Sequence, residues 1–428
     1  MPPRFQPPKG MRDFLPEEAQ KLRQVLDTCR KVFESYGFAP LETPAVESFD
    51  LLAAKKGLGE AAKDEIYYFK DKGDRELGLR FDLTVPLARI ILGNPSLPKP
   101  FKRYAVGKVY RYDNPQNMRW REFWQADIDT VGSPSPLADA ECISAAIDVL
   151  TQLGLEDFMI RINDRRVLEA AVEGLGVKKE DAPFVFRIID KLDKIGEEGV
   201  KKELWTKNID ADKVLDYIST SGKNSKVLEK LGKFVKDETL KDLKELLELA
   251  DKFGIDGRLK LDPSLVRGLD YYTGIVYEVS IGKVAVSCGG GGRYDDLVKN
   301  LGGPAIPATG ISLGIDRILA TLEEEARIKA AKTTKVFIAA ISDSVRDEVF
   351  KLAQSVRQTG VACATDVAGR NLSKQLDYAN VMGIPYVVII GENELKEKKA
   401  KIKNMLKSSE ETVKLSDLKE WAKALHSS

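Results

Sequence analysis

The sequence predicts an α+β domain with an antiparallel sheet, a helical insertion within that domain, and a C-terminal α/β domain with a mostly parallel sheet. Three observations support this fold class. The chain has 428 residues, which exceeds one compact core and indicates two or three domains. Its composition shifts to Lys, Glu, Asp and Leu between about residues 170 and 260. From residue 335 onward, strand patterns alternate with helical patterns, which is typical of βαβ units.

The first predicted element is an amphipathic helix over residues 17–36, which ends at Gly37. Its apolar residues recur at helical spacing: Leu22, Val25, Leu26, Cys29, Val32, Phe33 and Tyr36. From about residue 40 to 132 the pattern is mostly strand-like, residues 137–150 predict a helix, and residues 157–163 predict another strand. This order favours an antiparallel α+β core.

The predicted insertion covers residues 170–260 and is helical. Its segment DETLKDLKELLELADKF places leucines along a helix: Leu240, Leu243, Leu246, Leu247 and Leu249. Strand patterns return at 275–288 and a helix is predicted at 312–325, so the interrupted domain spans residues 1–325. The charged segment 326–334 is typical of a solvated linker.

The C-terminal domain, residues 335–428, has strand patterns at VFIAAIS (336–342), VACATD (361–366) and PYVVIIG (385–391), with helical patterns between them. It carries 15 basic and 12 acidic residues, a net charge of +3. One segment is rich in lysine: Lys396, Lys398, Lys399, Lys401, Lys403 and Lys407. Such a run suits contact with a phosphate backbone and is also typical of a solubilising surface, so both interpretations stay open.

The composition excludes several kinds of site. The chain has one histidine, His426, near its C-terminus, which excludes Ser-His-Asp, Cys-His and HExxH chemistry and the HIGH signature of one ligase class. It has no GxxxxGK[ST] phosphate loop, and its four cysteines form no CxxC pair. The net charge of +1 neither favours nor excludes nucleic acid. Because no signal segment and no run of about 18 apolar residues occurs, we expect a cytoplasmic protein without a membrane segment.

A hairpin is predicted over residues 101–132, with a polar loop from Asp113 to Trp120. Because side chains alternate along a strand, five residues of the second strand share one face: Arg121, Phe123, Gln125, Asp127 and Asp129. Arg111 ends the first strand, so its guanidinium is expected to approach these carboxylates. Such a face suits a zwitterion beside a phosphate. The alternative is an ordinary half-solvated sheet face.

Two further segments have unusual residues. GISLGIDRILATL (310–322) predicts a helix that starts near Ser312 and carries Arg317 in its first turns. A cation there opposes the helix dipole and needs either an anion such as a nucleotide or a surface Glu partner. CGGGGRYDDL (288–297) has four glycines that allow close approach of a ligand to the backbone, although glycine runs are more often loops.

Together these segments resemble the class II aminoacyl-tRNA synthetases, over nearly the whole chain. They follow the family order: PKGMRDFLP (8–16), YGFAPLETPAVES (36–48) with Pro44 as the motif 1 proline, VYRYDNPQNMRWREFWQADIDTVG (109–132) as motif 2, and GISLGIDRI (310–318) as motif 3. RGLDYYTG (267–274) and GGRYDDL (291–297) resemble segments specific to the histidyl-tRNA synthetases. RYDNP, NDRRVL and DAECI resemble the archaeal and eukaryotic branch of that family.

The resemblance implies roles for individual residues. Those implied for ATP are Arg111 at the α-phosphate, Asp113 near the adenine, Arg119, Phe123 under the adenine, and Arg317 over it. Those implied for histidine are Asp82, Thr84, Arg111, Gln125, Asp129, Arg267, Tyr271 and Tyr272, with the two tyrosines enclosing the imidazole. The family's RxE pattern is RxD here, so the side chain of Asp113 is one methylene shorter than in the family.

The catalytic groups implied by the resemblance are Arg267 and Arg111. When the histidine carboxylate attacks the α-phosphorus, negative charge builds on the phosphate oxygens, and guanidinium groups can stabilise it. No proton has to be abstracted from an ionised carboxylate, so the chain needs no ordered histidine for this step. ATP is then a substrate, Mg²⁺ is expected to enter with it, and no metal held by protein side chains is expected.

The implied partners are tRNA(His), L-histidine and a second copy of the chain, because motif 1 builds a twofold interface in this family. The insertion is implied to lie near the tRNA acceptor arm, and residues 335–428 to bind the anticodon. One alternative is a non-catalytic regulatory subunit that senses histidine for a phosphoribosyltransferase, but such paralogues commonly lack the anticodon-binding domain and depart at the position of Arg267. A synthetase for another amino acid of the subclass is disfavoured by RGLDYYTG.

Overall fold

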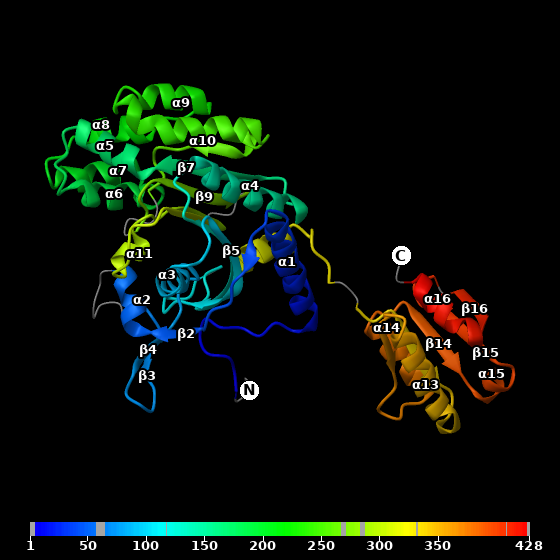
Figure 1. Cartoon of the computed structure of the whole chain (residues 1–428). Coiled ribbons are helices and arrows are strands. Elements are labelled where there is room, and N and C mark those ends of the chain that lie inside the picture. The colour runs from blue at the N-terminus through cyan, green and yellow to red at the C-terminus, as the bar shows by residue number, and fades with distance from the viewer. Residues whose placement is uncertain are drawn as a thin grey trace. The chain divides into compact units, whose positions relative to one another are not determined.

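The structure is a computed structural model that describes residues 5–56, 65–116, 118–266, 271–282, 287–330, 333–407 and 409–425. These residues form two units, Met1–Lys329 and Ala330–Ser428. Each unit has its own main sheet and its own helices (Figure 1). Across the described ranges, every helix is too short or too polar to span a bilayer.

The first unit is built on an eight-stranded sheet with the order β1-β5-β6-β11-β10-β9-β7-β8. Its strands are β1 (Ala39–Pro40), β5 (Phe101–Tyr110), β6 (Glu122–Val131), β7 (Phe158–Asp164), β8 (Leu259–Leu261), β9 (Ile275–Ile281), β10 (Gly289–Arg293) and β11 (Ala308–Gly314). Neighbours from β5 to β7 pair antiparallel, whereas β1 and β8 pair parallel at the two edges. The predicted antiparallel core is therefore confirmed, with one parallel strand added at each edge.

Helices α1 (Pro16–Ser35), α4 (Pro136–Gln152) and α12 (Ile315–Glu324) pack on one face of this sheet. α1 confirms the helix predicted at 17–36. It begins with Pro16, whose missing N–H is not needed at a first helical position, and Glu18 accepts a hydrogen bond from the Leu15 N–H at 3.1 Å. Its apolar side chains are buried against the sheet, which provides most of the stability of such a helix.

The opposite face of the sheet is partly covered by smaller elements. They are a three-stranded sheet of β2 (Val46–Ser48), β4 (Glu76–Leu79) and β3 (Tyr68–Lys70), and the helices α2 (Phe49–Lys56), α3 (Thr84–Gly93) and α11 (Leu297–Asn300). An apolar cluster joins α3 and α11 to the sheet. These elements surround the open middle of β6, β10 and β11.

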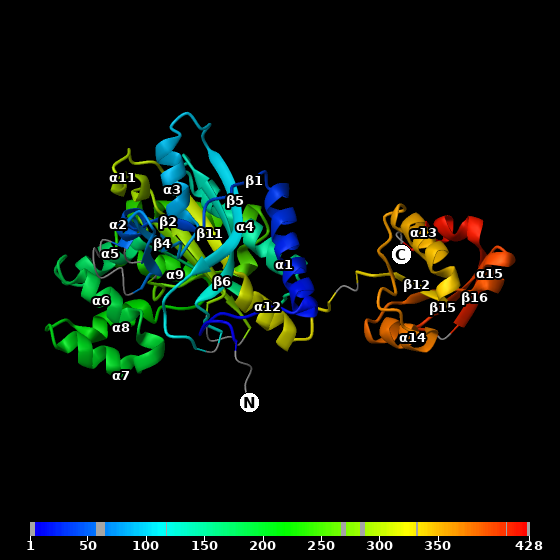
Figure 2. The same ribbon diagram turned by 90° about the horizontal axis from the view of Figure 1, so that it is seen from below.

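The chain between β7 and β8 is helical, and these helices gather at the end of the sheet where β7 and β8 lie (Figures 1 and 2). They are α5 (Arg165–Gly174), α6 (Ala182–Ile189), α7 (Leu192–Trp205), α8 (Ala211–Ile218), α9 (Asn224–Leu231) and α10 (Lys241–Lys252), with short 3₁₀ helices at Asp237–Leu240 and Asp256–Arg258. Their apolar residues belong to the same buried cluster as the sheet. Arg166 links the two parts through ion pairs with Asp164 and, at 2.8 Å, Asp242.

Two sequence-based expectations about this unit are wrong. The helix expected near Ser312 begins at Ile315, because residues 308–314 pair with β6 and β10 as a central strand. The glycine run is also not a loop, since Gly289–Arg293 forms β10 between β9 and β11. At Gly291 an added Cβ would collide with the Gly310 carbonyl oxygen and the Tyr277 ring, so the close approach of these strands requires glycine.

The second unit has a five-stranded sheet with the order β13-β12-β14-β15-β16. Its strands are β12 (Val336–Ala340), β13 (Cys363–Thr365), β14 (Tyr386–Ile390), β15 (Lys399–Asn404) and β16 (Ser409–Lys414), and its helices are α13 (Arg346–Arg357), α14 (Leu372–Val381), α15 (Glu392–Lys396) and α16 (Leu418–Ala424), with 3₁₀ helices at Asp343–Val345 and Leu415–Asp417. β12, β13 and β14 are parallel, which confirms the predicted βαβ units. The lysine-rich segment adds an antiparallel hairpin, β15–β16.

Candidate active site

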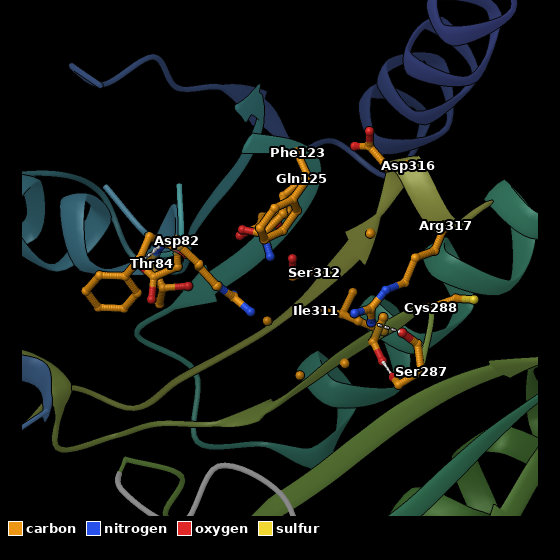
Figure 3. Close-up of a pocket in the computed structure, with 18 of the residues that line it drawn as sticks. Asp82, Thr84, Phe123, Gln125, Ser287, Cys288, Ile311, Ser312, Asp316 and Arg317 are labelled. Atoms are coloured by element: carbon orange, nitrogen blue, oxygen red, sulfur yellow. Dashed lines mark hydrogen bonds between the residues drawn. The ribbon is translucent and has the colours of Figure 1, made fainter. Parts of the chain in front are cut away.

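A cavity of about 470 Å³ opens over the middle of the eight-stranded sheet. The sequence-predicted site residues that line it are Asp82, Thr84, Arg111, Asp113, Arg119, Phe123, Gln125, Asp129, Tyr271, Tyr272 and Arg317. Arg267, the remaining one, lies outside the described residues. Figure 3 shows Asp82 and Thr84 at one end of the pocket and Arg317 at the other, with Phe123 and Gln125 between them.

Strand β6 supplies one wall of the pocket. Phe123, Gln125, Asp127 and Asp129 all line the cavity, because alternate side chains of a strand point to one face. Arg121, which shares that periodicity, does not line it and instead places its guanidinium 4.3 Å from the centre of the Tyr112 ring. The strand pattern therefore predicts this wall well, except at the end next to the loop.

Arg111 lies just after β5, and two contacts orient its side chain. Its Nε–H donates to the Phe81 carbonyl oxygen at 3.2 Å, and its Cζ lies 5.1 Å from the centre of the Phe123 ring. Among the residues that the structure describes, no carboxylate forms an ion pair with Arg111. Its terminal N–H groups are therefore available to an anionic ligand such as a phosphate.

The end of the pocket near α12 combines a cation, a ring and a polar loop. Arg317, in the first turn of α12, donates from Nε to the Met118 carbonyl oxygen at 3.1 Å and from Nη1 to the Ser287 carbonyl oxygen. Across the pocket from it lies Phe123 (Figure 3). An aromatic ring opposite a planar guanidinium suits a flat heterocycle held between them. Arg119 and Asp113, which pair at 3.2 Å, border the same end.

The other end of the pocket has a buried group of charges. Arg103 is 0 % exposed, and its Nη2 lies 2.7 Å from Asp129 Oδ2 and donates to the Leu83 carbonyl oxygen at 2.9 Å. Burial raises the pKa of Asp127 to about 7, Arg103 opposes that rise, and the neighbouring Asp129 adds to it. Asp82 also faces this group. Three carboxylates, those of Asp82, Asp127 and Asp129, line this end of the pocket and suit a ligand ammonium group.

Hydrogen bonds fix the carboxylates of this group. Asp82 Oδ1 accepts from the backbone N–H groups of Thr84 at 3.2 Å and Val85 at 3.0 Å, at the start of α3. Asp129 Oδ1 accepts from the Tyr294 hydroxyl. Within the described part of the chain, Gln125 Oε1 and Asp127 Oδ1 are buried without a hydrogen-bond partner. Because such atoms normally have one, both are candidate acceptors for a ligand N–H.

The two adjacent tyrosines also line this end. The ring centres of Tyr271 and Tyr272 are 4.2 Å apart with an interplanar angle of 37°, and Tyr294 lies 6.2 Å from Tyr271. Burial raises the pKa of Tyr271, so its hydroxyl stays neutral and is able to donate as well as accept. The rings form an aromatic wall beside the carboxylates.

Sequence reasoning missed several residues of the pocket. Asp127 shares the predicted face of β6 but received no role, and Ser312, assigned to a helix start, pairs directly opposite Asp127. Arg103 received no role, and Tyr294 was named only as part of GGRYDDL. Arg103 pairs opposite Asp129 in the β5–β6 hairpin, so the hairpin register is the signal that identifies it.

Comparisons with known proteins add independent information. The sequence matches the family model described as "Histidyl-tRNA synthetase" over residues 10–318 and "Anticodon binding domain" over residues 335–425. A histidine–tRNA ligase from Aeropyrum pernix is 42 % identical over 408 residues, which covers 91 % of either chain. The crystal structure of histidyl-tRNA synthetase from Nostoc sp. PCC 7120 aligns with a TM-score of 0.86 and 32 % identity over 98 % of this chain and 99 % of that one.

A second solved structure is similar in fold alone. It is titled an ATP phosphoribosyltransferase regulatory subunit/histidyl-tRNA synthetase from Bacillus halodurans C. It aligns with a TM-score of 0.78 over 91 % of this chain and 99 % of that one, at 23 % sequence identity. This likeness does not distinguish an enzyme from a regulatory subunit.

Proposed function

The chain belongs to the histidyl-tRNA synthetase family, and from this premise we infer that it is a histidine–tRNA ligase. It activates L-histidine with ATP to histidyl-adenylate and transfers the histidyl group to tRNA(His). The observation that carries this function is one pocket with an aromatic ring and a guanidinium at one end and three carboxylates at the other. That pocket has room and charge for a nucleotide beside a cationic amino acid.

For the nucleotide end, we propose that Phe123 stacks on the adenine, that Arg317 covers its other face, and that Asp113 and Arg119 bind near them. The placement of these four residues around one end of the cavity supports this assignment. Arg111 lies between this end and the carboxylates, where the α-phosphate of ATP and the carboxylate of histidine have to meet. Its lack of a described ion-pair partner favours that role.

For the amino-acid end, we propose that Asp82, Thr84, Gln125 and Asp129 bind the α-ammonium and the groups near it. The carboxylates that line this end and the unpaired Gln125 Oε1 support this. Tyr271 and Tyr272 would enclose the imidazole, as their rings form one wall. Polar groups that satisfy both ring nitrogens would reject analogues that lack them, because a buried unpaired group is costly.

We propose that Arg111 and Arg267 stabilise the transition state of adenylate formation. A carboxylate oxygen of histidine bonds to the α-phosphorus, and the bond from that phosphorus to pyrophosphate breaks. The charge that develops on the phosphate oxygens is met by guanidinium groups, and no proton is transferred. Mg²⁺ is proposed to enter bound to ATP.

For the second unit, we propose binding of the tRNA anticodon by residues 335–428. A cavity of about 220 Å³ lies among the loops that follow β12 and β13, at the carboxyl ends of parallel strands, where ligands of such sheets bind. Phe350, 40 % exposed, and Arg370, whose Cζ lies 4.1 Å from the centre of the Tyr378 ring, border it. Rings and guanidinium planes are the groups on which unpaired bases stack.

Lysines on β15 supply positive charge in the same unit. Ala400 and Ile402 are buried on one face of the strand, so Lys399, Lys401 and Lys403 lie on the other. Such a face suits a phosphate backbone.

We also propose that the chain forms a homodimer, as the motif 1 resemblance implies, and that it is cytoplasmic.

The function is tested by pyrophosphate exchange into ATP across the twenty amino acids, followed by charging of tRNA. We expect exchange with L-histidine and histidylation of tRNA(His) by the full chain. Exchange that requires a different amino acid and ignores histidine would contradict the assignment. Exchange without charging would favour a chain that only recognises histidine.

Replacing Phe350 by serine is expected to raise the KM for tRNA about 5- to 100-fold, because stacking of one base on a ring is worth about 1–3 kcal/mol. Pyrophosphate exchange should not change, since this reaction uses no tRNA. The matched control is Phe69→Ser, an exposed phenylalanine of β3 in the first unit that lines neither cavity and lies outside the insertion. An unchanged KM for tRNA in the Phe350 variant would remove this cavity from the proposed anticodon site.

A further inference from the structure

The N-terminal segment ahead of α1, residues 8–15, contacts the loop 113–120 and helix α12, which together form the nucleotide end of the pocket. Its central residue is Arg12, which does not itself line the cavity. We propose that Arg12 is a positioning residue, an inference that rests on the proposed function. It fixes the position of the ATP-binding loop, residues 113–120, relative to helix α12.

The side chain of Arg12 joins two elements. Its Cζ lies 4.2 Å from the centre of the Trp120 ring, at the end of the loop that carries Asp113 and Arg119. The same guanidinium lies 4.5 Å from the Phe14 ring. Its Nη2 donates to Asp316 Oδ1 at 2.8 Å. Arg12 therefore connects the ATP-binding loop to the residue that directly precedes Arg317.

Asp316 extends this link into the sheet. Its side chain is 3 % exposed, and its Oδ2 accepts from the Trp124 backbone N–H of β6 at 2.6 Å. Burial raises the pKa of Asp316, while the Trp124 N–H and Arg12 oppose the rise. Without Arg12 this buried carboxylate would lose its cation, which strongly disfavours its ionised form and its present position. The first turn of α12, and Arg317 with it, would then lose an anchor.

The backbone of the segment fixes the loop as well. The Arg121 N–H donates to the Gly10 carbonyl oxygen at 2.7 Å, and Arg121 Nε donates to the Asp113 carbonyl oxygen at 2.8 Å. Gly10 has φ +83°, and a Cβ there would lie 2.8 Å from Arg121 Cγ, so only glycine fits this contact. The segment thus contacts the loop near both ends, at Trp120 and through Arg121 at Asp113.

The histidine end is built separately. Asp129 is held by Arg103 and Tyr294, and Asp82 by the start of α3. These groups lie on β5, β6, the start of α3 and the segment after β10, and within the described residues the contacts of Arg12 with Asp316, Phe14 and Trp120 do not reach them. Loss of Arg12 should therefore weaken ATP binding selectively, which separates a positioning role from a general loss of structure.

The test is Arg12→Ala in the full chain, measured by histidine-dependent pyrophosphate exchange with each substrate varied. We expect the KM for ATP to rise roughly ten- to a hundredfold, because a partly buried ion pair and a stacked cation are lost together. The KM for histidine should stay within about twofold of the original. A KM for ATP within twofold, or equal rises for both substrates, would overturn the proposal.

Two further variants sharpen the result. Arg12→Lys keeps the charge near Asp316 but not the planar stack on Trp120, so it should recover part of the ATP affinity. Arg23→Ala, an exposed arginine of α1, should leave both KM values unchanged. If exchange by the wild-type chain does not require histidine, the proposed function fails. If exchange requires histidine but Arg12→Ala does not raise the KM for ATP more than the KM for histidine, this inference alone fails.

Discussion

Replacing Arg111 by alanine is expected to lower the rate of histidine-dependent pyrophosphate exchange by about 10²- to 10³-fold, the usual cost of removing one preorganised donor from developing charge. The Phe81 carbonyl oxygen at 3.2 Å and the Phe123 ring at 5.1 Å already orient this guanidinium. Since it has no described carboxylate partner, the substitution leaves no buried anion unpaired. The chain should therefore remain folded, and exchange at saturating ATP and histidine should report the loss.

Two further variants test why Arg111→Ala lowers the exchange rate. Arg111→Lys should recover little activity, because a point charge on a flexible stem does not provide two parallel N–H donors. Arg30→Ala, on the exposed side of α1, should retain full exchange. An Arg111→Ala rate within tenfold of the original would mean that this guanidinium does not stabilise the phosphate charge.

Arg267→Ala is expected nearly to abolish exchange, an expectation that rests on the sequence because Arg267 lies outside the described residues.

Local periodicity is sufficient to predict the wall of the pocket on β6. Phe123, Gln125 and Asp129 fall on one face because alternation in a strand depends only on neighbouring residues. Ser312 shows the limit of this reasoning. Its segment reads as the start of a helix, but hydrogen bonds to β6 and β10, supplied by residues distant in sequence, hold it in a strand. Tertiary pairing overrides local pattern there.

The register of strand pairing determines which charged side chains of the pocket lie next to each other, and local sequence patterns do not reveal it. Arg103 precedes Asp129 by 26 positions, and only the pairing of β5 with β6 sets them opposite each other. Tyr294, which follows the glycine strand β10, donates to Asp129 of β6 although β11 lies between these two strands in the sheet. Both contacts depend on how strands are ordered, so the composition of any one segment does not reveal them.

The Arg103–Asp129 pair gives the second large expected effect. Arg103→Met is expected to lower the free energy of unfolding by about 3–5 kcal/mol, because the buried Asp129 carboxylate loses its ion-pair partner. The side chains of Arg103 and Asp129 are 1 % and 4 % exposed, so water cannot replace the lost partner. Methionine fills similar space without the charge. Thermal or urea unfolding of the first-unit transition measures the change.

The loss should also depend on pH. The pKa of Asp127 is already raised to about 7, above its ordinary 3.8, so folding loses stability as the pH rises between these values. Without Arg103 the pKa of Asp127 should rise further, and the loss should continue to higher pH. We therefore expect the variant to be more strongly destabilised at pH 8 than at pH 5.5, where protonation of Asp127 relieves the repulsion.

A matched substitution on the same strand separates burial from charge. Lys108→Met removes the partner of Glu122, a pair at 2.7 Å whose side chains are 37 % and 20 % exposed. Water can solvate the remaining carboxylate, so its loss should cost less than about 1 kcal/mol and vary little with pH. If Arg103→Met behaves like Lys108→Met at both pH values, then the guanidinium is not what keeps the carboxylates of the pocket ionised. If it is destabilised at pH 8 and partly restored at pH 5.5, then Arg103 is what maintains the negative charge that the amino-acid end needs for a cationic substrate.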